Sequence, residues 1–445
     1  MRRDPNNSPY SNRHPFYRGS LISHIDFNKA ITTNLVFRIS LCSEVEMACF
    51  KSLFLLCTLA SLVHSQCNKE RARGLFKRSV YDFSVELLSR IVIDTDGHFV
   101  ASTLSPWTLL ATISLGATDN TLAEIQQVAH LHKLRCFNNR YLELVKDVSV
   151  EPLIRSSSIF IDQTLGLKEH FQRIITDTNI CNITPLDFSD FNVAASQINS
   201  YVRSATRGVI EDIVTPADLE GAFLIMTDAL YFKGSWTFPF SPEDTEYSTF
   251  YDSHKNPTGD VNLMFSRNSF NITNVDLIQA KVLEMPYGND GKYSMLLFLP
   301  HEGVTVHNVI DSLRKISLTS IFNRFKMSDP SEVDVQVPRF KISSDLDNLK
   351  ELLTDMGLRE TFDRNANFPR MSDYSVYVSS FIQKASIEVT EEGTEAGAAS
   401  SLGFTSRNFQ LIDDFNANKP FVYMVVDRAN EVPIFSGAYS KPSIY

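Results

Sequence analysis

Apolar residues follow one another in a pattern that predicts several buried strands. Residues 224–232 are mostly apolar on both faces, which is typical of a strand in the middle of a sheet. In residues 381–389 the apolar side chains share one face, so a second interior strand is expected there. Strands are also expected at residues 281–286, 293–299 and 333–338, the first two joined by the turn Asn289-Asp290-Gly291.

Two segments repeat apolar residues at helical spacing. Residues 79–91 place Phe83, Leu87 and Ile91 four positions apart, on one helix face. A second helix is expected to begin at Ser344 or Asp345 and to end at Gly357. Its apolar stripe is Leu346, Leu349, Leu353 and Met356.

Two polar residues interrupt the predicted interior strands. Asp228 lies within the apolar run 224–232, and Gln383 lies on the apolar face of residues 381–389. Burying such groups costs free energy unless they are hydrogen-bonded. Both therefore need partners in the interior.

Length and composition favour one large globular domain. The 445 residues are 43% hydrophobic and 21% charged, and no Pro/Gly/Ser-rich linker or internal repeat divides them. A net charge of -10 argues against general nucleic-acid binding. No G-x-S-x-G, H-E-x-x-H, Walker or dinucleotide motif occurs, and the histidines lack metal-ligand spacing. No enzyme activity, cofactor or metal is expected.

Residues 47–65 have the features of a secretory signal peptide. An apolar run of 11 residues follows Lys51, too short to cross a bilayer as a helix. Val63-His64-Ser65 then places small residues at both positions that determine cleavage. We expect cleavage before Gln66, secretion of residues 66–445 as a single domain, and residues 1–46 to be a mispredicted extension. The alternative is a buried apolar helix.

Secretion changes how the cysteines and two sequons are interpreted. Cys67, Cys136 and Cys181 follow the expected cleavage site, so at least one thiol is free or pairs with another chain. A bond between Cys67 and Cys136 is conceivable, and nothing in the sequence fixes it. Glycosylation is expected at Asn182 and Asn271, each of which begins an Asn-Ile-Thr sequon.

Residues 391–408 combine small residues with a single cation. Thr394, Ala396 and Ala398 fall on one face at period two, yet the segment has two internal glycines and little β-branched content. It is expected to be a loop that can become a strand. Arg407 is the only cation between Lys384 and Lys419, which indicates a site where a protease could cut.

This segment and a later one resemble the serpins. Glu391, Gly393, Thr394 and Glu395, followed by a run of small residues that includes Ala396 and Ala398, match the family's proximal hinge. Residues 415–425 are similar to its C-terminal signature, and serpin-like stretches run from about Phe83 to Pro442. The resemblance implies an α+β fold of three β-sheets surrounded by about eight or nine helices, with an exposed reactive loop at about residues 391–415.

The resemblance also gives the two interior polar residues a role. With Ser105 and Thr108, Asp228 and Gln383 would form the shutter, a polar cluster beneath the gap where the central sheet opens. Serpins usually have Asn at the position of Asp228 and often His at that of Gln383. The buried carboxylate needs donors, which the Gln383 amide and the Thr108 hydroxyl could supply.

The function implied by the resemblance is suicide inhibition of trypsin-like serine proteases by a monomer. By the family's spacing the cleaved residue is the seventeenth counted from Glu391, which makes Arg407-Asn408 the reactive bond. The segment that follows is about two residues longer than in antitrypsin, so Phe404 or Phe409 is the alternative, for a chymotrypsin-like protease. The rival function is that of a non-inhibitory carrier, chaperone or storage serpin.

A small basic cluster lies near where some serpins bind heparin-like polysaccharides. A solvated helix face is the favoured interpretation, because the cluster is short and the chain is acidic. Weak polysaccharide binding is the alternative. The cluster consists of His130, His132, Lys133, Arg135 and Arg140.

Overall fold

The computed structural model describes residues 68–148, 153–232, 234–393 and 412–445. The predicted signal peptide, Cys67 and the loop residues from Thr394 to Asn408 lie outside these ranges. Residues from Cys67 to Tyr445 belong to one compact unit. The described ranges hold nine α-helices: α2 (Lys69–Asp94), α3 (Leu104–Ser114), α4 (Asp119–Val128), α5 (Arg135–Val148), α6 (Glu169–Thr178), α7 (Phe191–Ala205), α8 (Val306–Ser312), α9 (Leu318–Met327) and α10 (Leu349–Asp355).

A five-stranded sheet contains both interior polar residues. Its order is β10 (Phe340–Leu346), β11 (Ser380–Val389), β4 (Leu224–Phe232), β2 (Leu153–Asp162) and β3 (Asn182–Leu186). Strands β11 and β4 run parallel at its centre, whereas β10 and β2 flank them antiparallel. All nine residues of β4 are buried, as its apolar sequence predicts.

A larger sheet accounts for the remaining strands. Its path is β1 (Phe99–Ser102), β14 (Val432–Tyr439), β13 (Phe421–Asp427), β8 (Tyr293–Pro300), β7 (Ala280–Pro286), β6 (Pro257–Val275), β9 (Ser331–Pro338) and β12 (Asp413–Asn416), with β5 (Glu246–Tyr251) beside β6. One part of β6 pairs with β5 and β9, and the other part pairs with β7. The long strand β6 thus joins two of the three sheets that the sequence led us to expect, and the α+β fold is confirmed.

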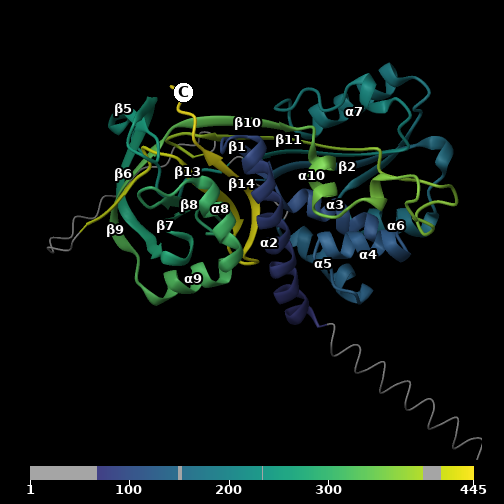
Figure 1. Ribbon diagram of the computed structural model, residues 1–445, viewed down its shortest axis with the longest axis horizontal. Helices are drawn as coiled ribbons and strands as arrows, with labels where there is room; N and C mark the ends of the chain where they lie inside the picture. Colours follow the sequence, from purple (N-terminus) through teal and green to yellow (C-terminus); the bar gives the residue numbers. More distant parts are fainter. Residues whose placement is uncertain (1–67, 149–152, 233, 394–411) are drawn as a thin grey trace, which may run out of the picture. The chain divides into compact units, whose positions relative to one another are not determined.

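The two faces of the five-stranded sheet meet different helices. Figure 1 shows α7 above this sheet and α3 below it. Helix α7 covers a small apolar core that includes Phe160, Ile225 and Ala229. Helix α3, whose eleven residues are all buried, contacts β2 and β4 from the main core. The sheet is therefore buried on both faces, which explains the near-continuous apolar sequence of β4.

The two predicted helices differ from the observed ones at their ends. Helix α2 begins well before residue 79, because the Asn68 side chain accepts a hydrogen bond from the Arg71 N–H at 2.8 Å and caps it. The helix expected to begin at Ser344 or Asp345 begins later in the structure. Residues up to Leu346 pair with β11 as part of β10, which keeps them extended, and α10 begins only at Leu349.

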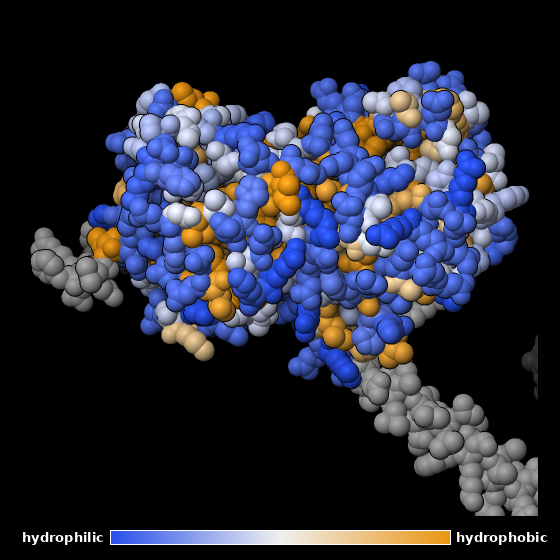
Figure 2. Space-filling model, viewed as in Figure 1, coloured by the Kyte–Doolittle hydropathy of each residue, from blue (hydrophilic) through white to orange (hydrophobic). Residues whose placement is uncertain are grey.

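Hydrophilic residues cover most of the face shown in Figure 2, with apolar residues scattered among them. Among the described helices, none combines the length and the apolar character needed to cross a membrane.

Candidate functional site

The chain turns back on itself directly after β11. Thr390 and Gly393 form an antiparallel bridge, with N–H to carbonyl distances of 2.8 Å and 3.2 Å in the two directions. The Thr390 hydroxyl donates a further bond of 2.8 Å to the Gly393 carbonyl. Because both ends are hydrogen-bonded, the turn Thr390–Gly393, which contains the first residues of the expected hinge, has a defined shape.

This turn is docked on the segment that follows β4. Gly393 forms a bridge with Ser235, and the Trp236 N–H donates to the Glu392 carbonyl at 3.1 Å. The Trp236 indole N–H donates to the Thr390 carbonyl at 3.0 Å, and its ring stacks on Tyr287 at 4.3 Å. The hinge therefore lies across the ends of both β11 and β4.

Gly393 is required at its position by conformation and by space. Its φ of +133° is rarely adopted by residues with a side chain. A Cβ there would lie 2.3 Å from the Gly234 carbonyl oxygen and 2.6 Å from the Ser235 Cα. These are backbone atoms, so no side-chain rotation can relieve the overlap.

Glu391 anchors the hinge through its side chain. It is 7% exposed, and its Oε1 accepts a hydrogen bond of 2.8 Å from the Thr245 hydroxyl. The guanidinium of Arg339 lies 3.5 Å from the same oxygen. The backbone carbonyl of Glu391 also accepts a hydrogen bond from the Phe240 N–H at 2.8 Å. The sequence marked Glu391 as a hinge residue but gave no sign of Thr245 or Arg339, which are distant along the chain.

Asp228 and Gln383 meet at the centre of the sheet. They are register partners across the parallel pair of β4 and β11, and both are fully buried. The Gln383 amide Nε2 donates to Asp228 Oδ2 at 2.7 Å. Gln383 also makes two bonds of 3.0 Å with the backbone of Ser102. The cluster thus connects the middle of the sheet to the segment leading into α3.

Ser157, and not Thr108, donates a hydrogen bond to the Asp228 carboxylate. The Ser157 hydroxyl donates to Asp228 Oδ1 at 2.7 Å, and Ser105 contributes another side-chain bond. The Thr108 hydroxyl instead donates to the Leu104 carbonyl at 2.7 Å. A threonine within a helix can satisfy its hydroxyl on the preceding turn, which explains why Thr108 differs from expectation.

Burial dominates the electrostatics of Asp228. Removal from solvent raises the pKa of the Asp228 carboxyl from 3.8 to about 6, although the bond from Ser157 and the charge of Arg155 act in the opposite direction. The carboxyl is consequently charged at neutral pH but titrates in the mildly acidic range.

The sequon asparagines, the cysteines and the basic cluster make local contacts. Asn182 donates to Thr184 at 2.8 Å, and Asn271 donates to Glu284 at 2.7 Å. Cys136 and Cys181 are free thiols. In the basic cluster, His130 lies 3.3 Å from Glu86 and Arg140 lies 2.8 Å from Glu143. Within the described ranges, no group of three His, Cys, Asp or Glu side chains could hold a metal ion.

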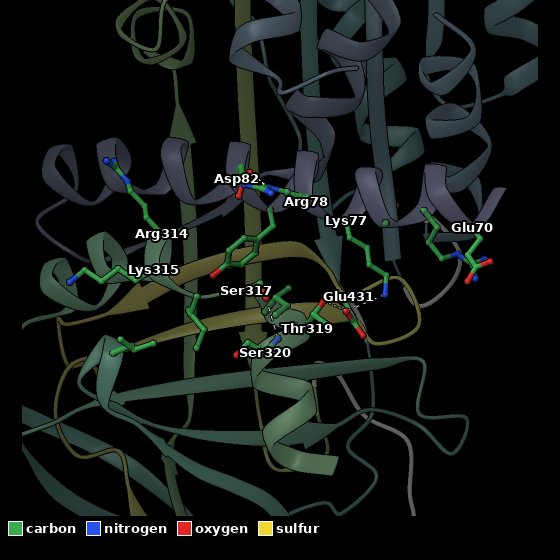
Figure 3. A pocket seen from close by; sticks show the side chains of 16 residues that line it. Glu70, Lys77, Arg78, Asp82, Arg314, Lys315, Ser317, Thr319, Ser320 and Glu431 are labelled. Atoms are coloured by element: carbon green, nitrogen blue, oxygen red, sulfur yellow. Dashed lines mark hydrogen bonds and ion pairs between the residues drawn. The ribbon is translucent and has the colours of Figure 1, made fainter. Parts of the chain in front are cut away.

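A groove of about 760 Å³ runs between α2 and the segment from Arg314 to Ser320. Figure 3 shows Lys77 of α2 facing Glu431 across it, whereas Arg78 and Asp82 lie beside each other on α2. Lys77 lies 3.1 Å from Glu431, and Arg78 lies 3.2 Å from Asp82. These two pairs account for four of the eight charged residues that line the groove, which has carboxylates as well as cations in its walls.

The fold and the hinge point to one class of protein, the serine protease inhibitors whose reactive loop adjoins a central sheet. A family model described as "Serpin (serine protease inhibitor)" matches residues 78–442. The chain therefore belongs to the serpin family. The family is described by inhibition of serine proteases and not by catalysis.

Individual relatives are similar over nearly their whole length. Serine protease inhibitor 2 of Anopheles gambiae is 28% identical over 87% of this chain and 98% of its own. Antitrypsin of Bombyx mori is 27% identical over 86% of this chain and 99% of its own. The solved structure of Serpin48, a highly specific serpin of Tenebrio molitor, matches with a TM-score of 0.71 and 26% identity, over 82% of this chain and 98% of that one.

Proposed function

We propose that this chain is a secreted inhibitor that is cut by trypsin-like serine proteases at Arg407-Asn408 and traps them by inserting the cut loop between β4 and β11. The observation that carries the proposal is the position of the hinge. Gly393 is bridged both to Thr390, just after β11, and to Ser235, just after β4. The residues that follow Gly393 therefore start at the end of the seam between these two strands.

The direction of the strands favours insertion at this seam. Strands β4 and β11 pair in parallel over seven register positions, from Ile225 with Ser380 to Tyr231 with Ser386. A loop that enters from the hinge runs opposite to both strands. It would replace one parallel ladder by two antiparallel ladders, and antiparallel pairing is slightly more stable per residue.

The loop sequence is compatible with burial in the sheet. Thr394, Ala396 and Ala398 share the face that would enter the interior, and all three are small. Non-inhibitory serpins often have bulky, charged or proline residues in this stretch, and apart from Glu395 none occurs here before Leu402. This difference favours the inhibitor over the carrier, chaperone or storage protein.

The chemical step is ordinary peptide-bond attack by the protease. Its serine Oγ adds to the Arg407 carbonyl, the bond to Asn408 breaks, and the serine proton passes through the protease histidine to the new amine of Asn408. An ester then joins the protease to Arg407. Insertion before hydrolysis of this ester would carry the protease across the molecule and distort its active site. Arginine suits a trypsin-like pocket, whose buried carboxylate pairs with it.

Incubation of the chain with trypsin, followed by a denaturing gel, tests this function. An inhibitor gives a covalent band at the summed mass of the two proteins. A carrier or storage protein gives only nicked product, and that result would overturn the proposal. The mass of the released C-terminal peptide distinguishes cleavage at Arg407 from cleavage at Phe404 or Phe409.

Secretion and modification belong to the same proposal. We expect the secreted form to begin near Gln66, to act as a monomer, and to carry glycans at Asn182 and Asn271. Sequencing the N-terminus of secreted protein checks the start, and a chain retaining Met1 would contradict it. Deletion of residues 1–46 should leave secretion intact.

A further inference from the structure

The outer edge of β2 is only partly covered. Strand β3 pairs with β2 from Ser158 to Asp162, so in the described part of the chain Leu153–Ser157 have a strand partner only on the β4 side. A cavity of about 490 Å³ lies along this uncovered edge. Its walls include Lys146 at the end of α5 and Tyr201 of α7. We call it the β2-edge cavity.

The charged groups that line the β2-edge cavity are all cations. Lys146 and Arg155 line it, and no aspartate or glutamate is among its lining residues. The groove beside α2 differs, because Glu70, Asp82 and Glu431 face its cations. The chain as a whole has a net charge of -10, so a cavity lined by cations alone differs in sign from the rest of the protein.

Two of its polar groups are buried without a partner. Arg155 Nη2 donates to the Ile180 carbonyl, whereas Arg155 Nη1 is buried and makes no hydrogen bond. The Ser156 hydroxyl is also unpartnered, and the residue is 3% exposed. A buried donor without a partner destabilises the folded protein, and the cost is larger when the donor is charged.

Successive residues of a strand point to opposite faces of the sheet. Arg155 therefore shares the face of Ser157, which bonds to Asp228. Ser156 instead lies opposite Ala229 on the face covered by α7. The unpartnered donor on the Arg155 face is thus Arg155 Nη1, and an acceptor in the cavity could satisfy it.

The neighbouring groups do not supply that acceptor. Burial raises the pKa of the Cys181 thiol to about 11, so the sulfur is neutral at physiological pH. The Asp228 carboxylate attracts Arg155 electrostatically, but it accepts its hydrogen bonds from Ser157, Gln383 and Ser105. The Lys146 ammonium donates to the Asp177 carbonyl at 3.0 Å, which uses one of its three protons.

We propose that the β2-edge cavity binds a phosphate or sulfate group through Arg155 and Lys146. Guanidinium and ammonium donors are the groups that proteins use for such oxyanions, and the cavity volume lies in the range of small-molecule sites. The group could belong to a free inorganic ion or to an ester on a small molecule. None of the residues that line this site belongs to the segment Thr390–Gly393, and the proposal does not depend on protease inhibition.

Calorimetric titration of the full chain tests the proposal. Inorganic phosphate, inorganic sulfate and glycerol phosphate are titrated separately at pH 7.4 and at constant ionic strength. Saturable binding of one ion per chain is expected. Tighter binding of glycerol phosphate than of inorganic phosphate would identify an ester as the ligand, and the reverse would identify the free ion.

Variants locate the binding in the cavity. Lys146→Gln, at an exposed position, should weaken binding about tenfold, which corresponds to the loss of one charged hydrogen bond. Ser156→Ala removes a hydroxyl that makes no bond in the protein and lies on the opposite face of the sheet from Arg155, so it should fold normally and bind like the parent. Lys315→Gln, in the groove beside α2, is the matched control and should bind like the parent. No saturable binding by the parent, or equal binding by the parent and Lys146→Gln, would overturn the proposal.

Discussion

The amide of Gln383 donates a hydrogen bond of 2.7 Å to the carboxylate of Asp228 across the seam between β11 and β4. Any strand that enters this seam must break that bond. The carboxylate would keep its bond from Ser157, which lies on β2. Opening the sheet therefore leaves a buried negative charge with fewer donors, which adds to the barrier for insertion.

The first prediction concerns the pH dependence of stability. The pKa of Asp228 is raised from 3.8 to about 6 in the folded chain, so between these values the folded state holds a proton that the unfolded state has lost. Its contribution to the free energy of unfolding therefore falls as pH rises from about 4 to about 6, by about 3 kcal/mol, and stays low above that range.

The Asp228→Asn variant isolates this contribution. The amide oxygen of the variant can accept from Gln383, and its amide nitrogen can donate to the Ser157 hydroxyl, so the packing is preserved. Denaturant unfolding at pH 4.5, 6 and 7.5 should show the variant gaining stability relative to the parent as pH rises. Asp311→Asn, at an exposed position, is the control and should follow the parent. A constant difference between Asp228→Asn and the parent would contradict the prediction.

The second prediction concerns Gly393. Gly393→Ala places a Cβ within 2.3 Å of the Gly234 carbonyl oxygen at a φ of +133°. The hinge must shift, and we expect the melting temperature to fall by a few degrees, since a destabilisation of a few kcal/mol is expected and about 1 kcal/mol corresponds to roughly 1–2 °C in a domain of this size. Gly221→Ala is the matched control, because its φ is +68° and no atom lies within 4 Å of the added Cβ. Equal losses in the two variants would show that contact with Gly234 is unimportant.

The third prediction concerns the anchoring of Glu391. Glu391→Lys brings a cation against Arg339 and removes the acceptor of the Thr245 bond, so we expect a loss of about 2–4 kcal/mol in the free energy of unfolding. Adding Arg339→Glu should restore part of the loss, because the ion pair is then reversed. The double-mutant cycle measures this coupling. If the two losses simply add, Glu391 and Arg339 do not interact.

The sequence predicted the central strands better than the contacts between them. The apolar runs of β4 and β11 were sufficient to locate both strands, and Asp228 and Gln383 stood out because they break those runs. Ser157 could not be found in this way, since its partnership with Asp228 follows from the register of β2 on β4 over 71 residues of sequence. A serine in a strand gives no signal of which carboxylate it will face.

Helix ends were predicted poorly where strand pairing competes with helix formation. The spacing of Leu346 and Leu349 fits a helix, but hydrogen bonding to β11 holds Leu346 in β10. The anchoring contacts of the hinge were equally hidden. Arg339 lies 52 residues before Glu391, and neither residue is unusual in its own segment.

The fourth prediction concerns the proposed reactive bond. Arg407→Ala should abolish the covalent complex with trypsin and leave the melting temperature unchanged, since the residue is proposed to supply specificity and not packing. Arg407→Lys is the matched control and should still trap trypsin, because lysine keeps the charge that the pocket requires. If Arg407→Ala traps trypsin as fast as the parent does, the reactive bond lies elsewhere.

The fifth prediction concerns the first residue that would enter the sheet. Thr394 leads the small face of the loop, ahead of Ala396 and Ala398, so a Thr394→Arg side chain would be buried without a counter-charge on insertion. The effective penalty for such a charge is several kcal/mol, and about 1.4 kcal/mol of added barrier already slows a step tenfold. Hydrolysis of the acyl-enzyme should then precede insertion, so that the variant behaves as a substrate.

The matched control for that variant carries the same charge on the opposite face. Glu395→Arg also places an arginine in the hinge, but at period two its side chain would point away from the face that Thr394 leads. After mixing with limiting trypsin, the ratio of cleaved to covalently complexed chain should rise strongly for Thr394→Arg and much less for Glu395→Arg. An unchanged ratio for Thr394→Arg would mean that this hinge does not insert, and equal rises in both variants would mean that charge acts on the loop before it enters the sheet.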